Sequence, residues 1–178
     1  MTRDELEHAI RAACDVSQDS EVWIFGSQAI LGEYPDAPAS LRQSIEVDIA
    51  PKNHPDRVDL IDGALGELSP FHAAYGYYVH GVSIKSAVLP DGWEERTIPV
   101  YGRGGEKAVG LCLERHDLAA SKLAASREQD LRFVRTMIAD DMLTVKVLHQ
   151  RIRSLPVKPE IRERLSRWVE AVGNTPAE

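Results

Sequence analysis

The sequence of 178 residues predicts an α+β protein, in which a small mixed β-sheet is followed by a helical C-terminal part. Two observations support this fold class. Short runs of strand-favouring residues, separated by turn residues, recur between residues 21 and 113. After Asp117 the apolar residues take a helical spacing that continues almost to the end. We therefore expect an α/β core over residues 1–113 and a helical part over residues 114–178.

The core is expected to open with a helix. Thr2 and Glu5 form a capping box, so the helix begins there and runs to about Val16. Further elements of the core are expected in this order: a strand over 21–25, a short helix over 28–32, a loop over 33–44, a strand over 45–49, a helix over 56–68, and strands over 77–80, 97–100 and 108–113.

The C-terminal part is expected to contain three helices, over residues 117–138, 142–153 and 158–172. Pro156 and Pro159 separate the last two, because proline cannot continue a helix interior.

Charge is distributed unevenly along the chain. Residues 1–100 hold 7 Lys/Arg against 17 Asp/Glu, and residues 101–178 hold 14 against 11. Solvated helix faces would explain this difference. So would an acidic, metal-binding half next to a basic half that meets a polyanion. The net charge of −7 argues against indiscriminate coating of nucleic acid.

The sequence lacks the features of an exported or membrane-spanning protein. No apolar stretch approaches the roughly 20 residues that span a bilayer, and the N-terminus has no signal-peptide pattern. Cys14 and Cys112 lack any metal or redox spacing and are interpreted as buried, reduced thiols. These features predict a cytoplasmic protein.

Glu46 and Asp48 form the first candidate site. They lie two residues apart on an expected strand, so both carboxylates leave the same face. Two close anions repel each other, and a divalent cation such as Mg²⁺ or Mn²⁺ removes that cost. The alternative is a solvent-facing strand that carries two solvated acids.

Gly26 and Ser27 strengthen the metal interpretation. They end the first expected strand and lead into a helix, where backbone N–H groups and a hydroxyl suit phosphate oxygens. This order of elements places a phosphate-binding turn and a metal pair on neighbouring strands, which is the arrangement that nucleotidyl transfer requires.

The segments IFGSQAI and SIEVDIA resemble the Gly-Ser and paired-acid signature of polymerase-β-type nucleotidyltransferases. Three later segments, GYYVHGV, LPDGWEER and LERHDLAASKLAASREQDLRF, resemble short bacterial nucleotidyltransferase-like proteins allied to AbiEii/MenT-type toxins. Together these segments span roughly residues 22–138. The resemblance implies that the α/β core is a metal-dependent nucleotidyltransferase core, with Mg²⁺ or Mn²⁺ as cofactor.

The resemblance also implies roles for residues of the C-terminal part. Lys122 and Asp130 match a Lys and an Asp that join the active site of those toxins, so both are candidate catalytic residues. Lys122 and Arg127 are candidate nucleotide-binding residues, together with Gly26 and Ser27. A continuous helix would place Lys122 and Asp130 about 80° apart on one broad face. The alternative is an exposed ion pair on an amphipathic helix.

The leading functional hypothesis is transfer of NMP from an NTP to an acceptor. The resemblance implies RNA, at the 3′ end of tRNA, and a toxin that pairs with a cognate antitoxin protein. Three alternatives stay open: an enzyme that modifies a protein, an enzyme that modifies an antibiotic, and an inactive module that binds a nucleotide or a partner. The inactive module stays open because the first acid of the pair is Glu46 rather than Asp.

Overall fold

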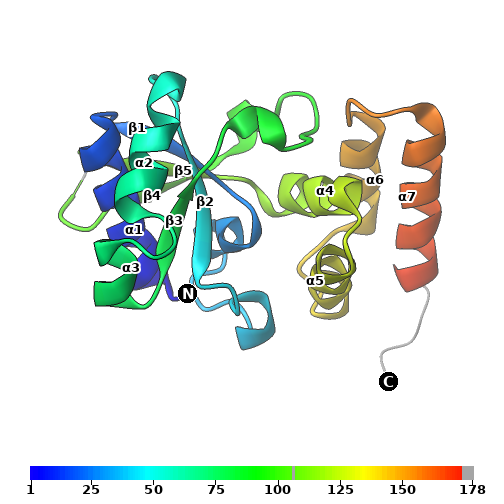
Figure 1. Ribbon diagram of the computed structural model, residues 1–178. Coiled ribbons are helices and arrows are strands. Elements are labelled where there is room, and N and C mark those ends of the chain that lie inside the picture. Colours follow the sequence, from blue (N-terminus) through cyan, green and yellow to red (C-terminus); the bar gives the residue numbers. More distant parts are fainter. Residues whose placement is uncertain (106, 174–178) are drawn as a thin grey trace. The chain divides into compact units, whose positions relative to one another are not determined.

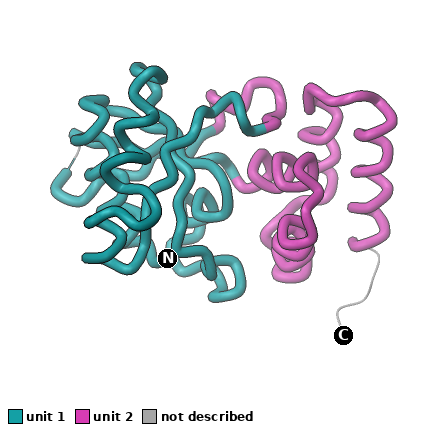
Figure 2. Tube along the Cα trace, viewed as in Figure 1, with its two compact units in different colours: residues 1–87, 97–114 teal, residues 88–96, 115–178 magenta. Residues whose placement is uncertain are grey.

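The structure is a computed structural model that describes residues 1–105 and 107–173. The chain divides into two compact units, coloured separately in Figure 2. The first contains Met1–Ala87 and Thr97–Glu114, and the second contains Val88–Arg96 and Arg115–Glu178. Residues 88–96 therefore group with the helices that follow residue 114 rather than with the sheet.

Within the described residues, the first unit is built on a five-stranded mixed sheet (Figure 1). The strands in spatial order are β3 (Tyr78–Gly81), β2 (Glu46–Pro51), β1 (Glu21–Phe25), β5 (Val109–Cys112) and β4 (Ile98–Tyr101). β1 is the central strand; it runs parallel to β5 and antiparallel to β2. β2 runs parallel to β3, and β4 runs antiparallel to β5. The predicted α+β class with a small mixed sheet is confirmed.

Helices α1 (Arg3–Ser17), α2 (Val58–Leu65) and α3 (Pro70–Tyr75) are grouped on one face of this sheet in Figure 1. The Thr2–Glu5 capping box is present, so the predicted helix start is confirmed. The apolar stripe of α1 is fully buried at Leu6, Ala9, Ile10 and Ala13. Burial of this stripe stabilises the helix by the hydrophobic effect.

Two predicted boundaries in this region need correction. α2 ends at Leu65 rather than Leu68, because Gly66 leaves the helical conformation with ψ −176°. α3 was not predicted, although Ser69 accepts a hydrogen bond from the His72 N–H and Pro70 starts the helix. That combination is an ordinary helix start signal. The remaining helical turns are short 3₁₀ helices, η1 (Ser27–Gly32), η2 (Ala39–Leu41), η3 (Pro55–Arg57) and η4 (Ile84–Ser86).

The second unit contains helices α4 (Arg115–Ala125), α5 (Glu128–Ala139), α6 (Val145–Arg153) and α7 (Pro159–Gly173), together with the 3₁₀ helix η5 (Trp93–Arg96). The predicted single helix over residues 117–138 is wrong. Ser126 adopts the left-handed conformation with φ +55°, and Arg127 is extended. The Ser126 hydroxyl donates to the Leu123 carbonyl, so this residue closes α4.

No helix among the residues that the structure describes is long and apolar enough to cross a membrane.

Candidate functional site

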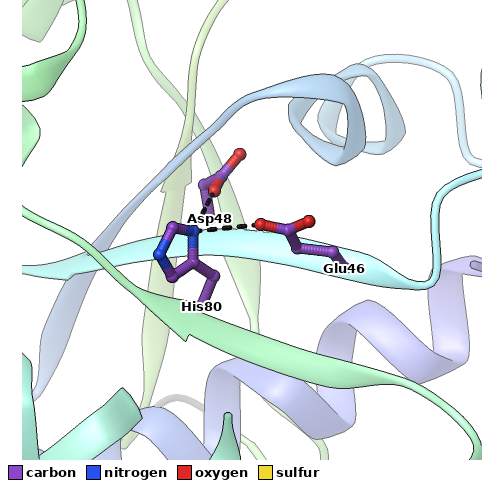
Figure 3. Close-up of side chains that lie close together, drawn as sticks. All are labelled: Glu46, Asp48 and His80. Carbon is purple, nitrogen blue, oxygen red and sulfur yellow. Dashed lines mark hydrogen bonds and ion pairs between the residues drawn. The ribbon is translucent and has the colours of Figure 1, made fainter. Parts of the chain in front are cut away.

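Strand β2 carries Glu46 and Asp48 on one face of the sheet (Figure 3). Val47 lies between them and is 1% exposed, whereas both acids are partly exposed. The alternation of acidic and apolar residues places the two carboxylates on the accessible face and the valine in the core. The structure thus brings the two acids together as the sequence pattern indicates.

His80 on β3 faces both acids. β3 runs parallel to β2, with Asp48 opposite His80 in the register. The His80 Nδ1 atom lies 3.0 Å from Oε1 of Glu46 and 3.0 Å from Oδ1 of Asp48 (Figure 3). Partial burial acts to lower the pKa of His80, but the hydrogen bond and negative charge of Asp48, with the charge of Glu46, raise it above its usual value.

Tyr78 holds the second oxygen of Glu46. Its hydroxyl donates to Oε2 of Glu46 over 3.1 Å, and the two residues are paired in the register of β2 and β3. Burial and the negative charge of Glu46 raise the pKa of Tyr78 to about 12. The phenol therefore stays protonated at neutral pH and keeps donating to the carboxylate.

Gly26 lies directly beside Asp48. It follows β1 with φ +67°, and a Cβ atom at this position would stand 2.0 Å from Oδ2 of Asp48. Only glycine allows this approach and this backbone conformation. Ser27 then begins η1, a 3₁₀ helix in place of the short helix predicted over residues 28–32. The predicted turn and the predicted acid pair are therefore neighbours.

The residue after Ser27 anchors this turn. Gln28 is fully buried, and its side-chain amide donates to the carbonyl of Ser44 over 2.9 Å. The Ser44 hydroxyl accepts a hydrogen bond from the backbone N–H of Glu46. These bonds connect η1 to the residue that enters β2, so they help to fix Glu46 relative to the Gly26 turn.

Glu46, Asp48 and His80 together present the donor atoms of a candidate metal site. One donor atom from each residue lies within 4.8 Å of the other two. Two carboxylates and an imidazole suit a divalent cation. The alternation over residues 45–49 predicted the two acids, but no pattern in the sequence links His80 to them. His80 joins the acids only through the pairing of β2 with β3.

Lys122, Asp130 and Arg127 come together inside the second unit. Nζ of Lys122 lies 3.2 Å from Oδ1 of Asp130, and Nε of Arg127 lies 2.7 Å from Oδ2. Lys122 is 7% exposed and Asp130 is 1% exposed. Burial acts to raise the pKa of Asp130, but the hydrogen bond from Arg127 and the charge of Lys122 lower it overall. The alternative of an exposed Lys122–Asp130 pair is therefore wrong.

Arg96 in η5 pairs with a buried carboxylate of the second unit. In the structure it donates twice to Asp117, through Nε over 2.7 Å and Nη2 over 2.9 Å. Asp117 is fully buried and also lies 3.0 Å from Nε of Arg151. Arg96 thus connects η5 to α4, and these bonds support a structural role.

The sequence that forms this site matches a known protein family. A family model described as "Nucleotidyltransferase of unknown function (DUF6036)" matches residues 4–169, which include the Gly26 turn, the acid pair and His80. No curated protein and no solved structure matches the chain. The predicted kinship with nucleotidyltransferases is confirmed at this level, and the alliance with AbiEii/MenT-type toxins stays a prediction. The chain belongs to this family of nucleotidyltransferases of unknown function.

Proposed function

We propose that the chain transfers a nucleoside monophosphate from an NTP to an acceptor hydroxyl, with Glu46 and Asp48 as ligands of Mg²⁺ or Mn²⁺. The observation that carries this proposal is the approach of Gly26 to Asp48 in a chain that matches a nucleotidyltransferase family. A glycine turn beside paired carboxylates provides a place for phosphate next to a place for a cation.

Each of these residues has a defined part in the proposed reaction. Glu46 and Asp48 hold the cation, which supplies charge neutralisation and alignment of the phosphates when it is bound. Gly26 lets the backbone approach the carboxylate and the nucleotide without a side chain in the way. Ser27 contributes its hydroxyl and backbone N–H to phosphate oxygens.

For residues of the second unit we propose the roles that the resemblance to the toxins implies. Lys122 and Arg127 bind the nucleotide, and Asp130 orients both cationic groups. The hydrogen bonds from Lys122 and Arg127 to the two oxygens of Asp130 support this orienting role. On this proposal Lys122→Ala abolishes transfer at temperatures where the variant is folded, whereas a purely structural cluster would leave transfer by the folded variant intact.

We propose RNA, at the 3′ end of tRNA, as the acceptor, and toxicity that a cognate antitoxin protein suppresses. The excess of Lys and Arg after residue 100 supports a polyanionic acceptor. Protein and antibiotic hydroxyls are the competing acceptors.

The test is transfer of label from each of the four α-labelled NTPs. Total tRNA, a cell protein extract and an aminoglycoside are offered as acceptors, with Mg²⁺ or Mn²⁺. We expect label on tRNA, and its loss in Asp48→Asn, which keeps the size of the side chain but removes the charge. Transfer by Asp48→Asn at the wild-type rate would overturn the site assignment. Label on protein or aminoglycoside alone would overturn the RNA acceptor and keep the reaction.

A nucleotide-binding module without transfer activity is the second candidate. The contact of His80 with both carboxylates favours it, because a protonated imidazole can take the place of a cation there. This candidate predicts that an NTP binds without divalent metal and is not consumed. Equilibrium dialysis with labelled NTP in EDTA, followed by analysis of the recovered nucleotide, distinguishes the two functions.

A further inference from the structure

The third member of the Glu46–Asp48–His80 cluster is a nitrogen donor. His80 presents Nδ1 to one oxygen of each acid, at 3.0 Å from Oε1 of Glu46 and 3.0 Å from Oδ1 of Asp48. The three side chains keep 43%, 36% and 29% of their surface exposed for His80, Glu46 and Asp48. The donor atoms thus converge, and solvent or a nucleotide phosphate can complete a coordination shell.

Neighbouring groups fix the direction of both carboxylates. Tyr78 bonds Oε2 of Glu46, which leaves Oε1 for His80. Oδ2 of Asp48 lies against the open side of Gly26, which leaves Oδ1 for His80. Outer groups that orient ligands in this way commonly accompany metal sites.

The spacing of the donors allows one cation to reach all three residues. Nδ1 of His80 lies at hydrogen-bond distance, 3.0 Å, from one oxygen of each acid, and one donor atom from each residue lies within 4.8 Å of the other two. Coordination requires the neutral imidazole, so a cation would take the place of the proton that these contacts share.

The chemical nature of the donors distinguishes Mg²⁺ from Mn²⁺ at this site. Mg²⁺ is a hard ion that prefers oxygen ligands, whereas imidazole suits first-row transition metals. Carboxylates and phosphate oxygens suit Mn²⁺, so a set of two carboxylates and one imidazole favours Mn²⁺ over Mg²⁺. We propose that His80 is the third protein ligand of this site and that its nitrogen makes the site select Mn²⁺ over Mg²⁺. This inference rests on the proposed function for the presence of a metal, and it adds a ligand and a selectivity.

The first experiment measures metal affinity without any reaction. Calorimetric titration of the metal-stripped full chain with MnCl₂ and with MgCl₂ gives the ratio of the two affinities. We expect His80→Ala to lower Mn²⁺ affinity by roughly tenfold or more with a smaller effect on Mg²⁺. His80→Asp should shift the ratio towards Mg²⁺, because it restores an all-oxygen set. His54→Asn is the matched control, because His54 follows the opposite end of β2.

The second experiment detects the ligand atom directly. Pulsed EPR of Mn²⁺ bound to the wild-type chain should show coupling to an imidazole ¹⁴N nucleus. Labelling the histidines with ¹⁵N should change that signal, and His80→Ala should abolish it. Bound Mn²⁺ without nitrogen coupling, or an unchanged Mn²⁺/Mg²⁺ ratio in both His80 variants, would overturn the inference.

The outcomes separate this inference from the proposed function. Nitrogen-coupled Mn²⁺ without transfer from any NTP would support the metal site and overturn the enzymatic proposal. Transfer with Mg²⁺ in a chain whose bound Mn²⁺ shows no nitrogen coupling would support the enzyme and overturn the role of His80. Circular dichroism melts of each variant establish that the fold is retained, and His80→Asp provides a second variant should His80→Ala fail to fold.

Discussion

At the scale of single residues, the most restrictive feature is the contact between Gly26 and Asp48. The 2.0 Å between Oδ2 of Asp48 and the place of a Gly26 Cβ atom is far below any van der Waals contact. The turn therefore has two requirements that glycine alone meets: a positive φ and an empty volume for the carboxylate. The carboxylate of Asp48 therefore requires glycine at position 26, whether or not the turn also binds phosphate.

Gly26→Ala should therefore displace the Asp48 carboxylate and abolish metal binding. The matched control is Gly76→Ala: φ at Gly76 is +76°, but nothing lies within 4 Å of its Cβ position. Gly76→Ala should lose about 1–2 kcal/mol of stability, because Gly76 has the left-handed conformation. Gly26→Ala should lose more, because φ +67° with ψ −166° is a conformation that essentially only glycine adopts. In calorimetric titration with Mn²⁺ we expect no binding for Gly26→Ala and wild-type affinity for Gly76→Ala. Equal affinities in the two variants would contradict the steric explanation.

The residues of the sheet site could be predicted only in part. Alternation along one strand identifies Glu46 and Asp48, because side-chain direction there has a period of two. His80 also lies on a predicted strand, but its partner depends on which strand β3 joins and in which register. Side chains far apart in the sequence meet through strand pairing, which local patterns do not encode.

At the scale of elements, the break between α4 and α5 determines the surroundings of Lys122. A single helix would have put Lys122 and Asp130 on one exposed face. The turn at Ser126 instead folds α5 back, so that Asp130 accepts from Lys122 in a buried setting and the ring of Phe133 lies 4.5 Å from Nζ. Helical periodicity continues through this turn, and Ser126 carries no strong stop signal, so the sequence pattern did not predict it.

The burial of this pair predicts a large stability effect for Lys122→Ala. Removal of the ammonium leaves Asp130 with fewer partners, and breaking a buried ion pair costs about 3–5 kcal/mol. We expect about 3 kcal/mol, because Arg127 still bonds Asp130. Urea denaturation followed by circular dichroism measures this loss.

Glu128→Ala is the matched control for Lys122→Ala. Glu128 pairs with Arg132 at 4.0 Å, and both side chains are largely exposed, so its loss should cost well under about 1 kcal/mol. If Lys122→Ala and Glu128→Ala unfolded at the same urea concentration, the Lys122–Asp130 pair would not stabilise the second unit. Transfer assays on Lys122→Ala have to be run below its own melting range, so that lost activity is not confused with unfolding.

Asp19 forms a second link between elements, and the contribution of this link to stability depends on pH. Asp19, in the connection from α1 to β1, accepts hydrogen bonds from the backbone N–H groups of Asn53 and His54 after β2. Burial acts to raise the pKa of Asp19, but its hydrogen bonds with Asn53, Glu21 and His54 lower it overall. A carboxyl group with a lowered folded-state pKa contributes stability above its unfolded pKa of about 3.9. That contribution is lost as the pH falls through the folded pKa.

Asp19→Asn should therefore flatten the decline in unfolding free energy below about pH 4 and lower stability at pH 7. Urea titrations at a series of pH values between 2 and 7 measure both effects. Asp36→Asn, on the exposed loop before β2, is the control and should follow the wild-type curve. A wild-type acid profile in Asp19→Asn would show that this link does not contribute to acid sensitivity.

At the scale of the whole molecule, the sequence predicts which helices and strands form better than it predicts how they are arranged in space. The class, most strands and the helical C-terminal part follow from local periodicity. The strand order β3-β2-β1-β5-β4 does not, because the pairing of distant strands depends on tertiary contacts. The grouping of Val88–Arg96 with the helical unit has a similar cause, since the Arg96–Asp117 bonds join segments about twenty residues apart.

Binding of metal and nucleotide should stabilise the whole chain by linkage. A ligand at about one hundred times its dissociation constant adds roughly 2.7 kcal/mol. For a chain of 178 residues each kcal/mol raises the melting temperature by about 2–4 °C, so the expected rise is about 5–10 °C. Differential scanning calorimetry with NTP and Mn²⁺ measures it. EDTA should remove most of the rise, because the phosphates bind through the cation that Glu46 and Asp48 hold.

Asp48→Asn separates this linkage from nonspecific stabilisation by salt or nucleotide. The side chain keeps its size and a polar oxygen beside Gly26 but loses the negative charge that attracts the cation. The variant without ligand should melt close to the wild type, because removal of one of two close carboxylates also relieves repulsion. With NTP and Mn²⁺ its melting temperature should stay at the unliganded value. A rise that is the same with EDTA as with metal, or the same in Asp48→Asn as in the wild type, would place nucleotide binding away from this carboxylate pair and contradict the proposed function.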